Sequence, residues 1–201
     1  MLIILLLIVG VSFVTFTKQQ YSADTRVFAD IPDSLTSTIV VPGLIKTEFM
    51  DSPDGTETLT MERQEKGDKF RYSFFTSDTS KEAQQFIYTK ELTLSYGQLS
   101  IPYNTWSPDN TYFFIKESTA SQNNYYVFFA SGENFSDYSQ YLDIQRLFEE
   151  KIQGFTISDV TGWAAPTLLI INTQEQEGEQ KVSFWFDVQT QSFTRLGTYF
   201  K

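Results

Sequence analysis

The sequence predicts a mostly β fold of repeated antiparallel β-sheet units, with one inserted amphipathic helix and a hydrophobic helix at the N-terminus. Aromatic residues make up 16% of the 201 residues, led by 19 Phe and 11 Tyr, and these residue types favour strands. A turn followed by an apolar run occurs three times along the chain. One segment near the middle of the chain instead places apolar residues at a helical spacing.

Residues 1–17 are predicted to be a transmembrane anchor or a signal segment. Residues 1–16 are apolar or neutral throughout, slightly short of the roughly 20 residues that a membrane span needs. The basic start of a signal peptide is absent, which favours an uncleaved anchor over cleavage. A span that starts before residue 1 is a further alternative. We expect a linker over 18–37 and an extracytoplasmic β domain over 38–201, periplasmic or at the cell surface, and secreted if the N-terminus is cleaved.

The first repeat opens with the turn Asp51-Ser-Pro-Asp-Gly, because Pro53 presets φ for a turn and Asp54 tolerates its tight corner. Strands are expected over 57–63, 69–76 and 84–90, and residues 91–99 are expected to add a fourth. Before this turn, residues 38–45 predict a short strand that Pro42 confines to a sheet edge or a strand end.

The second and third repeats open with Trp106-Ser-Pro-Asp-Asn and with Trp163. The intervals nearly match, since Pro53 and Pro108 are 55 residues apart and the two Trp residues are 57 apart. Strands are expected over 111–117, 124–130, 167–172, 181–188 and 193–199. Between these repeats, apolar residues at a spacing of three to four predict an amphipathic helix over 137–153 that ends near Gly154.

The run Trp106-Ser-Pro-Asp-Asn-Thr-Tyr-Phe-Phe-Ile resembles the signature of TolB-like and WD-repeat-related β-propellers, a Trp-Ser-Pro-Asp-Gly turn followed by a strand. Asp51-Ser-Pro-Asp-Gly-Thr matches the turn without the Trp, and Val160-Thr-Gly-Trp163 with Thr167-Leu-Leu-Ile-Ile is similar to a degenerate form. The resemblance covers about residues 48–201. It implies an extracytoplasmic binding module without catalytic residues, whose repeats open at Pro53, Asp54, Trp106, Pro108, Asp109 and Trp163.

Three repeats are too few for an ordinary ring, because propellers typically close with about four to eight blades. The sequence therefore leaves open an incomplete propeller, one completed by a partner chain, an association of identical chains, or another β architecture with similar hairpins. Open end sheets would be prone to aggregation. We expect the helix over 137–153 and the segment 39–45 to cover them.

Charge and composition exclude several kinds of function. The net charge of −10 argues against binding nucleic acid through its phosphates. The absence of Cys and His removes disulfides, thiol catalysis, His-based triads and most transition-metal sites, so we expect no cofactor and no metal. Asp51, Asp54 and Gly55 lack the alternating ligands of a calcium loop, which favours a plain turn.

The leading hypothesis is a membrane-anchored, non-enzymatic binding module for a protein or envelope partner. The alternative is an enzyme that acts on glycans through two carboxylates about 5–10 Å apart. Glu149 and Glu150, with Asp143 and Asp159, are candidates, although neighbouring helix positions favour a solvated face. Trp106 and Trp163 are candidates for lining a ligand groove, although packing aromatics are the favoured interpretation.

Overall fold

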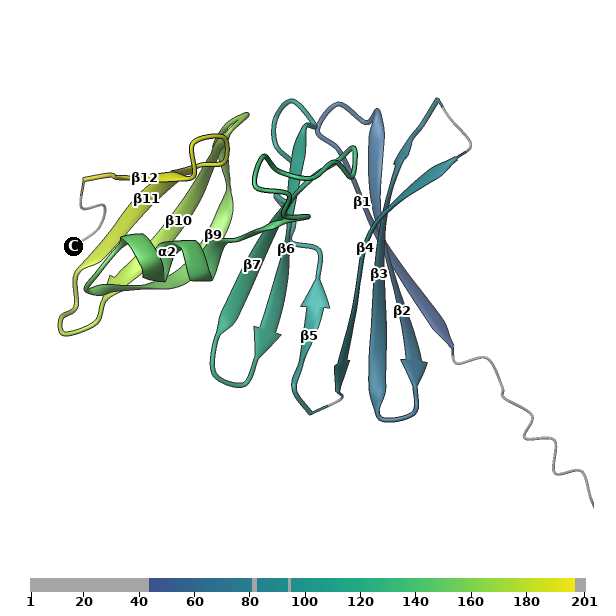
Figure 1. Cartoon of the computed structure of the whole chain (residues 1–201), viewed down its shortest axis with the longest axis horizontal. Coiled ribbons are helices and arrows are strands. Elements are labelled where there is room, and N and C mark those ends of the chain that lie inside the picture. Colours follow the sequence, from purple (N-terminus) through teal and green to yellow (C-terminus); the bar gives the residue numbers. More distant parts are fainter. Residues whose placement is uncertain (1–43, 81–82, 94, 198–201) are drawn as a thin grey trace, which may run out of the picture. The chain divides into compact units, whose positions relative to one another are not determined.

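A computed structural model describes residues 44–80, 83–93 and 95–197, which form three antiparallel sheets and one short helix (Figure 1). The predicted anchor over 1–17, the linker over 18–37 and residues 39–43 of the segment 39–45 lie outside the described residues. Among the helices of the described ranges, none has both the length and the apolar character needed to cross a membrane.

Each sheet is a four-stranded meander in which every strand pairs with its neighbours in sequence. The mostly β prediction is therefore confirmed. The strands are β1 (Ile45–Asp51), β2 (Glu57–Lys66), β3 (Lys69–Asp78) and β4 (Gln84–Thr93) in sheet 1; β5 (Gly97–Ser100), β6 (Tyr112–Thr119), β7 (Asn123–Phe129) and β8 (Leu142–Asp143) in sheet 2; and β9 (Phe155–Ala165), β10 (Leu168–Glu175), β11 (Lys181–Asp187) and β12 (Ser192–Arg195) in sheet 3.

The strand expected over 91–99 is divided between two sheets. Strand β4 ends at Thr93, a turn follows in which Tyr96 N–H donates to Thr93 O at 3.0 Å, and β5 then pairs with β6 of sheet 2. Gly97 makes this second pairing possible, because a Cβ at this position would lie 2.3 Å from the backbone oxygen of Ser118. A continuous pattern of strand-forming residues therefore conceals a change of sheet.

The helix predicted over 137–153 is shorter, since α2 spans Ile144–Lys151. Asp143 caps its start by accepting a hydrogen bond from Arg146 N–H at 3.1 Å. Tyr138 lies in the preceding loop with φ of 65°, a conformation that a helix cannot contain. The helix contacts β7, β8 and β9, so it packs where sheets 2 and 3 meet rather than over an end sheet.

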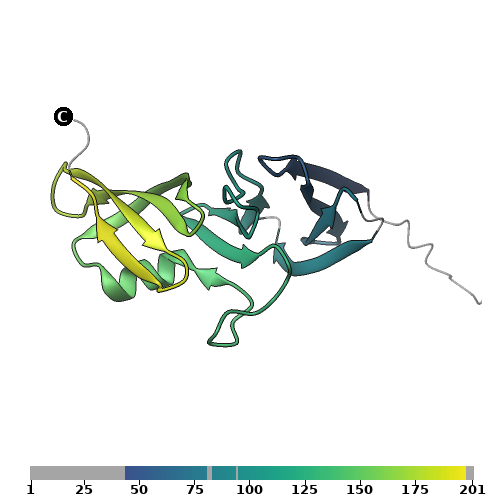
Figure 2. The same cartoon turned by 90° about the horizontal axis from the view of Figure 1, so that it is seen from above.

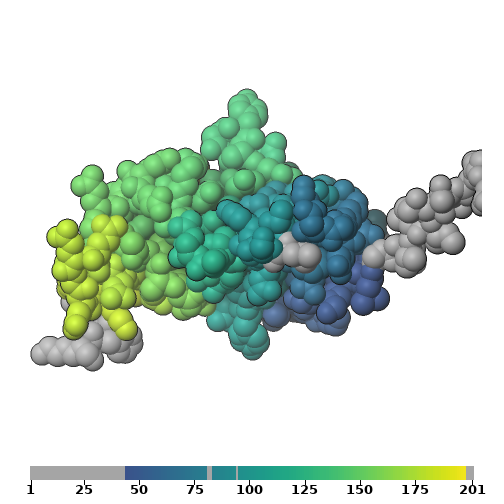
Figure 3. Space-filling model, turned by 90° about the horizontal axis from the view of Figure 1, so that it is seen from below, coloured from purple at the N-terminus to yellow at the C-terminus, as the bar shows by residue number. Residues whose placement is uncertain are grey.

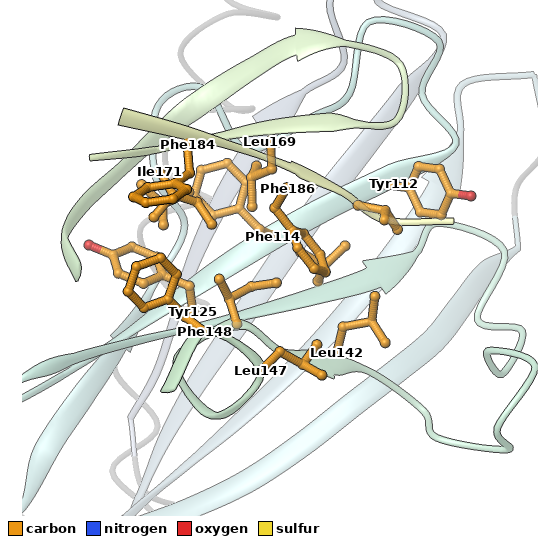
Figure 4. Packing of buried hydrophobic residues seen from close by; sticks show 14 of the residues in the cluster. Tyr112, Phe114, Tyr125, Leu142, Leu147, Phe148, Leu169, Ile171, Phe184 and Phe186 are labelled. Atoms are coloured by element: carbon orange, nitrogen blue, oxygen red, sulfur yellow. The ribbon is translucent and has the colours of Figure 1, made fainter. Parts of the chain in front are cut away.

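Sheet 2 lies between the other two sheets and is buried on both faces (Figures 1 and 2). Successive residues of a strand point to opposite faces, and the side chains of β6 and β7 follow this alternation. Phe113, Ile115, Tyr126 and Phe128 pack with sheet 1. On the opposite face of sheet 2, a second core joins it to sheet 3 and α2 (Figure 4); its strand residues in sheet 2 are Tyr112, Phe114, Tyr125 and Val127.

The outward faces of sheets 1 and 3 carry both polar and aromatic side chains. On sheet 1, Thr60 lies in one row across the strands with Phe49, Phe75 and Phe86. Thr58 of β2 pairs with Asp51, and Phe113 of β6 makes the equivalent pair with Trp106. Thr58 and Thr60 of sheet 1 therefore occupy the positions that Phe113 and Ile115 occupy in sheet 2. On sheet 3, Ser183 Oγ donates to Asn172 Oδ1 at 2.7 Å.

Candidate functional site

The first repeat opens with a turn held by the side chains of Ser52 and Asp54. Glu57 N–H donates to Ser52 Oγ at 3.0 Å, and the Ser52 hydroxyl donates to Asp54 Oδ1 at 2.9 Å. Thr56 donates to the same carboxylate oxygen from its N–H at 3.0 Å and from its hydroxyl at 2.8 Å. The Thr56 N–H, with the hydroxyl and amide donors around it, lowers the pKa of Asp54 well below its usual range.

The second repeat makes the same turn 55 residues later. Tyr112 N–H donates to Ser107 Oγ at 2.9 Å, the Ser107 hydroxyl donates to Asp109 Oδ1 at 2.7 Å, and the Thr111 hydroxyl donates to Asp109 Oδ2 at 2.7 Å. Burial opposes ionisation of Asp109, but the hydrogen bonds from Ser107 and Thr111 outweigh it and lower its pKa. Both aspartates are therefore occupied as hydrogen-bond acceptors of their turns.

Asn110 connects the two turns. It has φ of 59°, where the first turn has Gly55 with φ of 72°, and both residue types tolerate this left-handed conformation. The Asn110 amide donates to Asp54 Oδ1 at 2.7 Å and to Thr56 Oγ1 at 3.1 Å. The turn of sheet 2 is thus hydrogen-bonded to the turn of sheet 1.

The two repeat-opening tryptophans make equivalent bonds to the preceding sheet. Trp106 Nε1–H donates to Met50 O at 2.9 Å, and Trp163 Nε1–H donates to Thr105 O at 3.0 Å. Met50 precedes Ser52 by two residues, and Thr105 precedes the equivalent serine of the second turn by two residues. Each indole therefore ties the start of one repeat to the start of the repeat before it.

The third turn keeps this framework without the Ser-Pro-Asp residues. Ala165 pairs with Leu168, which leaves a turn of only two residues. Even so, Val188 N–H donates to Thr167 O at 2.9 Å, just as Ala130 N–H donates to Thr111 O at 3.0 Å in the second repeat. The third repeat is a shortened version of the other two.

A cavity of about 610 Å³ lies where the openings of the three repeats meet, and we call it the aromatic groove. Each repeat contributes to it, including four of the six sequence-predicted residues. Its aromatic and larger apolar lining residues are Met50 and Pro53 from the first repeat, Tyr103, Trp106 and Pro108 from the second, and Trp163 and Ile170 from the third.

The groove offers aromatic and apolar surface rather than reactive groups. Both indole N–H groups are already bonded to backbone carbonyls. Tyr103 is 85% exposed, in the loop between β5 and β6, which projects on the side opposite the β7–β8 loop (Figure 3). Asp51 is the carboxylate of this lining, and its Oδ1 accepts a bond from the Thr58 hydroxyl at 2.7 Å. Such a surface is suited to holding a ligand by packing.

The other two sequence-predicted residues do not line the groove. Asp109 lines a second cavity of about 630 Å³ between sheets 1 and 2, and Asp54 is held within its turn. Sequence reasoning missed Tyr103, Asn104 and Gly162 in the groove. Gly162 has φ of 138°, and a Cβ there would lie 2.9 Å from the Asn104 Cβ, so glycine is required for the close approach of β9. The glycine directly before Trp163 was the sequence feature that could have indicated this close approach.

The second cavity has an acidic lining. Its acidic lining residues are Glu57, Asp78, Asp109 and Glu133. Within the described ranges, no group of three or more Asp or Glu residues is arranged to hold a metal ion.

The carboxylates considered from the sequence are placed elsewhere. Asp159 accepts from Tyr125 OH at 2.8 Å, and Asp143 caps α2. On the helix, Glu149 accepts from Gln145 Nε2 at 2.6 Å and Glu150 pairs with Arg146 at 2.7 Å. These four residues stabilise local structure and line neither cavity.

Comparison with known proteins supports the fold. Neither protein-family models nor curated proteins give a match to this sequence. Among solved structures, an oligogalacturonate lyase in complex with manganese is similar, with a TM-score of 0.54 and 10% sequence identity. The match covers 79% of this chain and 43% of that chain, so this protein spans less than half the length of the lyase. At this identity the likeness concerns the fold alone.

Proposed function

We propose that this domain is a non-catalytic, propeller-like binding module whose aromatic groove holds an extended segment of a partner protein. The observation that carries the proposal is the joint construction of the groove by the openings of all three repeats. Pockets that bind ligands by packing are concave, mostly apolar and rich in aromatic side chains. The propeller-like arrangement is supported by the equivalent turns and by the likeness to the lyase fold.

Strand β1, next to the groove, favours a peptide as the ligand. It pairs with β2 on one side, and Phe49 on it is 71% exposed. Ser52 N–H donates to Glu57 O at 2.8 Å, so Ser52, Met50 and Glu48 belong to the set that faces β2. Thr47 and Phe49 therefore direct their backbone groups outward, because alternate residues of an antiparallel strand face the same side. An extended peptide can pair with this edge while its side chains enter the groove.

The setting of the module is proposed from the sequence. Residues 1–17 anchor the chain in a membrane, and the domain lies outside the cytoplasm, where a protein or envelope component is its partner. In this proposal the stack of three sheets stays open in a single chain, with Thr58 and Thr60 at the outward positions that are Phe113 and Ile115 in sheet 2. Completion of a ring by a partner chain or by a second copy is the alternative.

Selection from a displayed library of random peptides on the immobilised full-length chain tests the proposal. Selected peptides should bind the Tyr103→Ala variant about tenfold more weakly, as expected for loss of an aromatic anchor. Tyr138→Ala is the matched control, because Tyr138 is 88% exposed on the β7–β8 loop and lies outside the groove. Failure to enrich any peptide, or equal binding by both variants, would contradict the proposal.

A second candidate function is a carboxylate-dependent enzyme that acts on glycans. It is favoured by the acidic lining of the second cavity and by the likeness to a lyase for oligogalacturonate. Incubation of the full-length chain with oligogalacturonate, with and without Mn²⁺, separates the two functions. Our leading proposal predicts no turnover. Turnover that disappears in Glu133→Gln would instead favour the enzyme.

A further inference from the structure

A third cavity, of about 340 Å³, lies between sheets 1 and 2 and is separate from the groove and from the acidic cavity. Its lining includes Arg63, Phe70 and Tyr72 from sheet 1, Tyr96 from the turn before β5, and Gln98 and Ser118 from sheet 2. None of these residues lines either of the other two cavities. We call it the Arg63 cavity.

Tyr72 is the first unusual feature of this cavity. The residue is fully buried, and its hydroxyl has no hydrogen-bond partner in the described part of the chain. Two other buried tyrosines donate to carboxylates: Tyr125 to Asp159 at 2.8 Å and Tyr126 to Glu117 at 2.5 Å. A buried hydroxyl without a partner is costly, and such groups commonly mark an absent water or ligand.

Arg63 is the second unusual feature. Its guanidinium lies 4.7 Å from the centroid of the Phe70 ring, and within the described ranges it forms no ion pair. On the opposite face of the sheet, Arg71 has a carboxylate partner, since its Nη2 lies 2.7 Å from Glu91 Oε1. Arg63 therefore presents a charged donor group to the cavity with its charge unpaired.

We propose that the Arg63 cavity binds a small organic monocarboxylate. Guanidinium groups match the two oxygens of a carboxylate, and the Tyr72 hydroxyl is a further donor for an anionic oxygen. Phe70 and Tyr96 supply aromatic walls for a short apolar body. A doubly charged phosphate is less suited, because the lining has one cation and the chain carries a net charge of −10.

Titration of the full-length chain with benzoate, acetate and inorganic phosphate at constant ionic strength tests the proposal. Binding is followed by NMR through the Arg63 Nε–H and Tyr72 ring signals. Benzoate should bind saturably and more tightly than phosphate. Arg63→Gln should weaken benzoate about tenfold or more, and Tyr72→Phe about threefold or more, through lost hydrogen bonds to a charged group. Arg71→Gln, on the other face, should bind benzoate like the wild type.

Two further measurements make the result decisive. Tyr72→Phe without ligand should melt at a higher temperature than the wild type, because it removes a buried hydroxyl that has no partner. Arg63→Lys replaces Arg63→Gln if the latter does not fold. It retains the positive charge without the paired N–H donors of the guanidinium, so it should bind benzoate more weakly than the wild type. Equal binding of benzoate and phosphate, or wild-type affinity in the Arg63 variants, would overturn the proposal, and so would a wild-type chain that shows no saturable binding.

Discussion

The side-chain amide of Asn110 lies 2.7 Å from Asp54 Oδ1 and joins the opening turns of two successive repeats. The two Ser-Pro-Asp turns share the same internal hydrogen bonds. The residue after the aspartate differs, since it is Gly55 in the first turn and Asn110 in the second, and the link is made by this Asn110. One amide thereby fixes sheet 2 against sheet 1 at the end where the groove forms.

Asn110→Ala should destabilise the fold more than Asn110→Gly. Both variants lose the amide that donates to Asp54, at a cost of about 1 kcal/mol. Alanine also places a side chain at a φ of 59°, which adds about 1 kcal/mol of strain, whereas glycine adopts this conformation freely. Urea denaturation followed by circular dichroism measures both values. Wild-type stability in Asn110→Ala would show that the link is not formed.

Asp54 should make the free energy of unfolding of the domain fall at low pH. Its pKa is lowered in the folded state, chiefly by the Thr56 N–H and then by the Asn110 amide, so its contribution is complete above the unfolded-state pKa of about 4. That contribution is lost as the pH falls from about 4 towards the folded-state pKa.

Asp54→Asn should therefore be less stable than the wild type at pH 7, and the gap should narrow between about pH 4 and pH 2. Thermal melting across this range measures the gap, with Glu133→Gln as a control at an exposed carboxylate outside the turns. A gap that stays constant with pH would contradict the assigned role of Asp54.

Glu117 is a buried carboxylate whose partners come from two sheets. It is 1% exposed and accepts from Lys90 Nζ at 2.6 Å and from Tyr126 OH at 2.5 Å. Burial, and then the bond to Glu117, raises the pKa of Tyr126 far above its usual range. Lys90→Met should cost about 3 kcal/mol, since it leaves a buried charge uncompensated.

The double variant Lys90→Met with Glu117→Gln should recover much of that loss, because the charge is removed together with its partner. Chemical denaturation of the two single variants and the double variant gives the coupling between the residues. Additive losses would contradict an ion pair between sheets 1 and 2.

The open stack of sheets predicts a monomer in solution. Thr58 and Thr60 occupy the outward positions that are Phe113 and Ile115 in the buried sheet, so β2 lacks the apolar pair that packs sheet 2 on sheet 1. The outward Phe49, Phe75 and Phe86 are the surface that a dimer would cover instead. Light scattering of the full-length chain in detergent, with the detergent mass subtracted, gives the protein mass. A dimer would favour two chains that complete a six-sheet ring.

Local chemistry explains which features were predictable from the sequence. The Ser-Pro-Asp turns were found because their hydrogen bonds lie within six residues of chain. The helix was predicted too long because Tyr138, Tyr141 and Leu142 have helical spacing but different surroundings. Tyr141 packs on Phe128 with ring centroids 5.5 Å apart, whereas Leu142 lies in the core between sheets 2 and 3.

The groove could not be predicted as a cavity, because its walls come from three segments that are far apart in sequence. Trp106 and Trp163 were considered for such a groove, but the neighbouring Tyr103 carries no local pattern that separates it from other exposed tyrosines. Only the equivalent pairing of the repeats, with each indole reaching back to the preceding sheet, brings these residues together.

Hydrogen exchange of the three indole N–H groups, followed by NMR, tests the stacking of the repeats most directly. Trp106 and Trp163 donate to Met50 O and Thr105 O, so their indole protons should exchange slowly. Trp185, which is half-exposed on the outward face of sheet 3, should exchange rapidly. Equally rapid exchange at all three indoles would contradict the account, because the bonds that bring the three repeats together around the groove would then be absent.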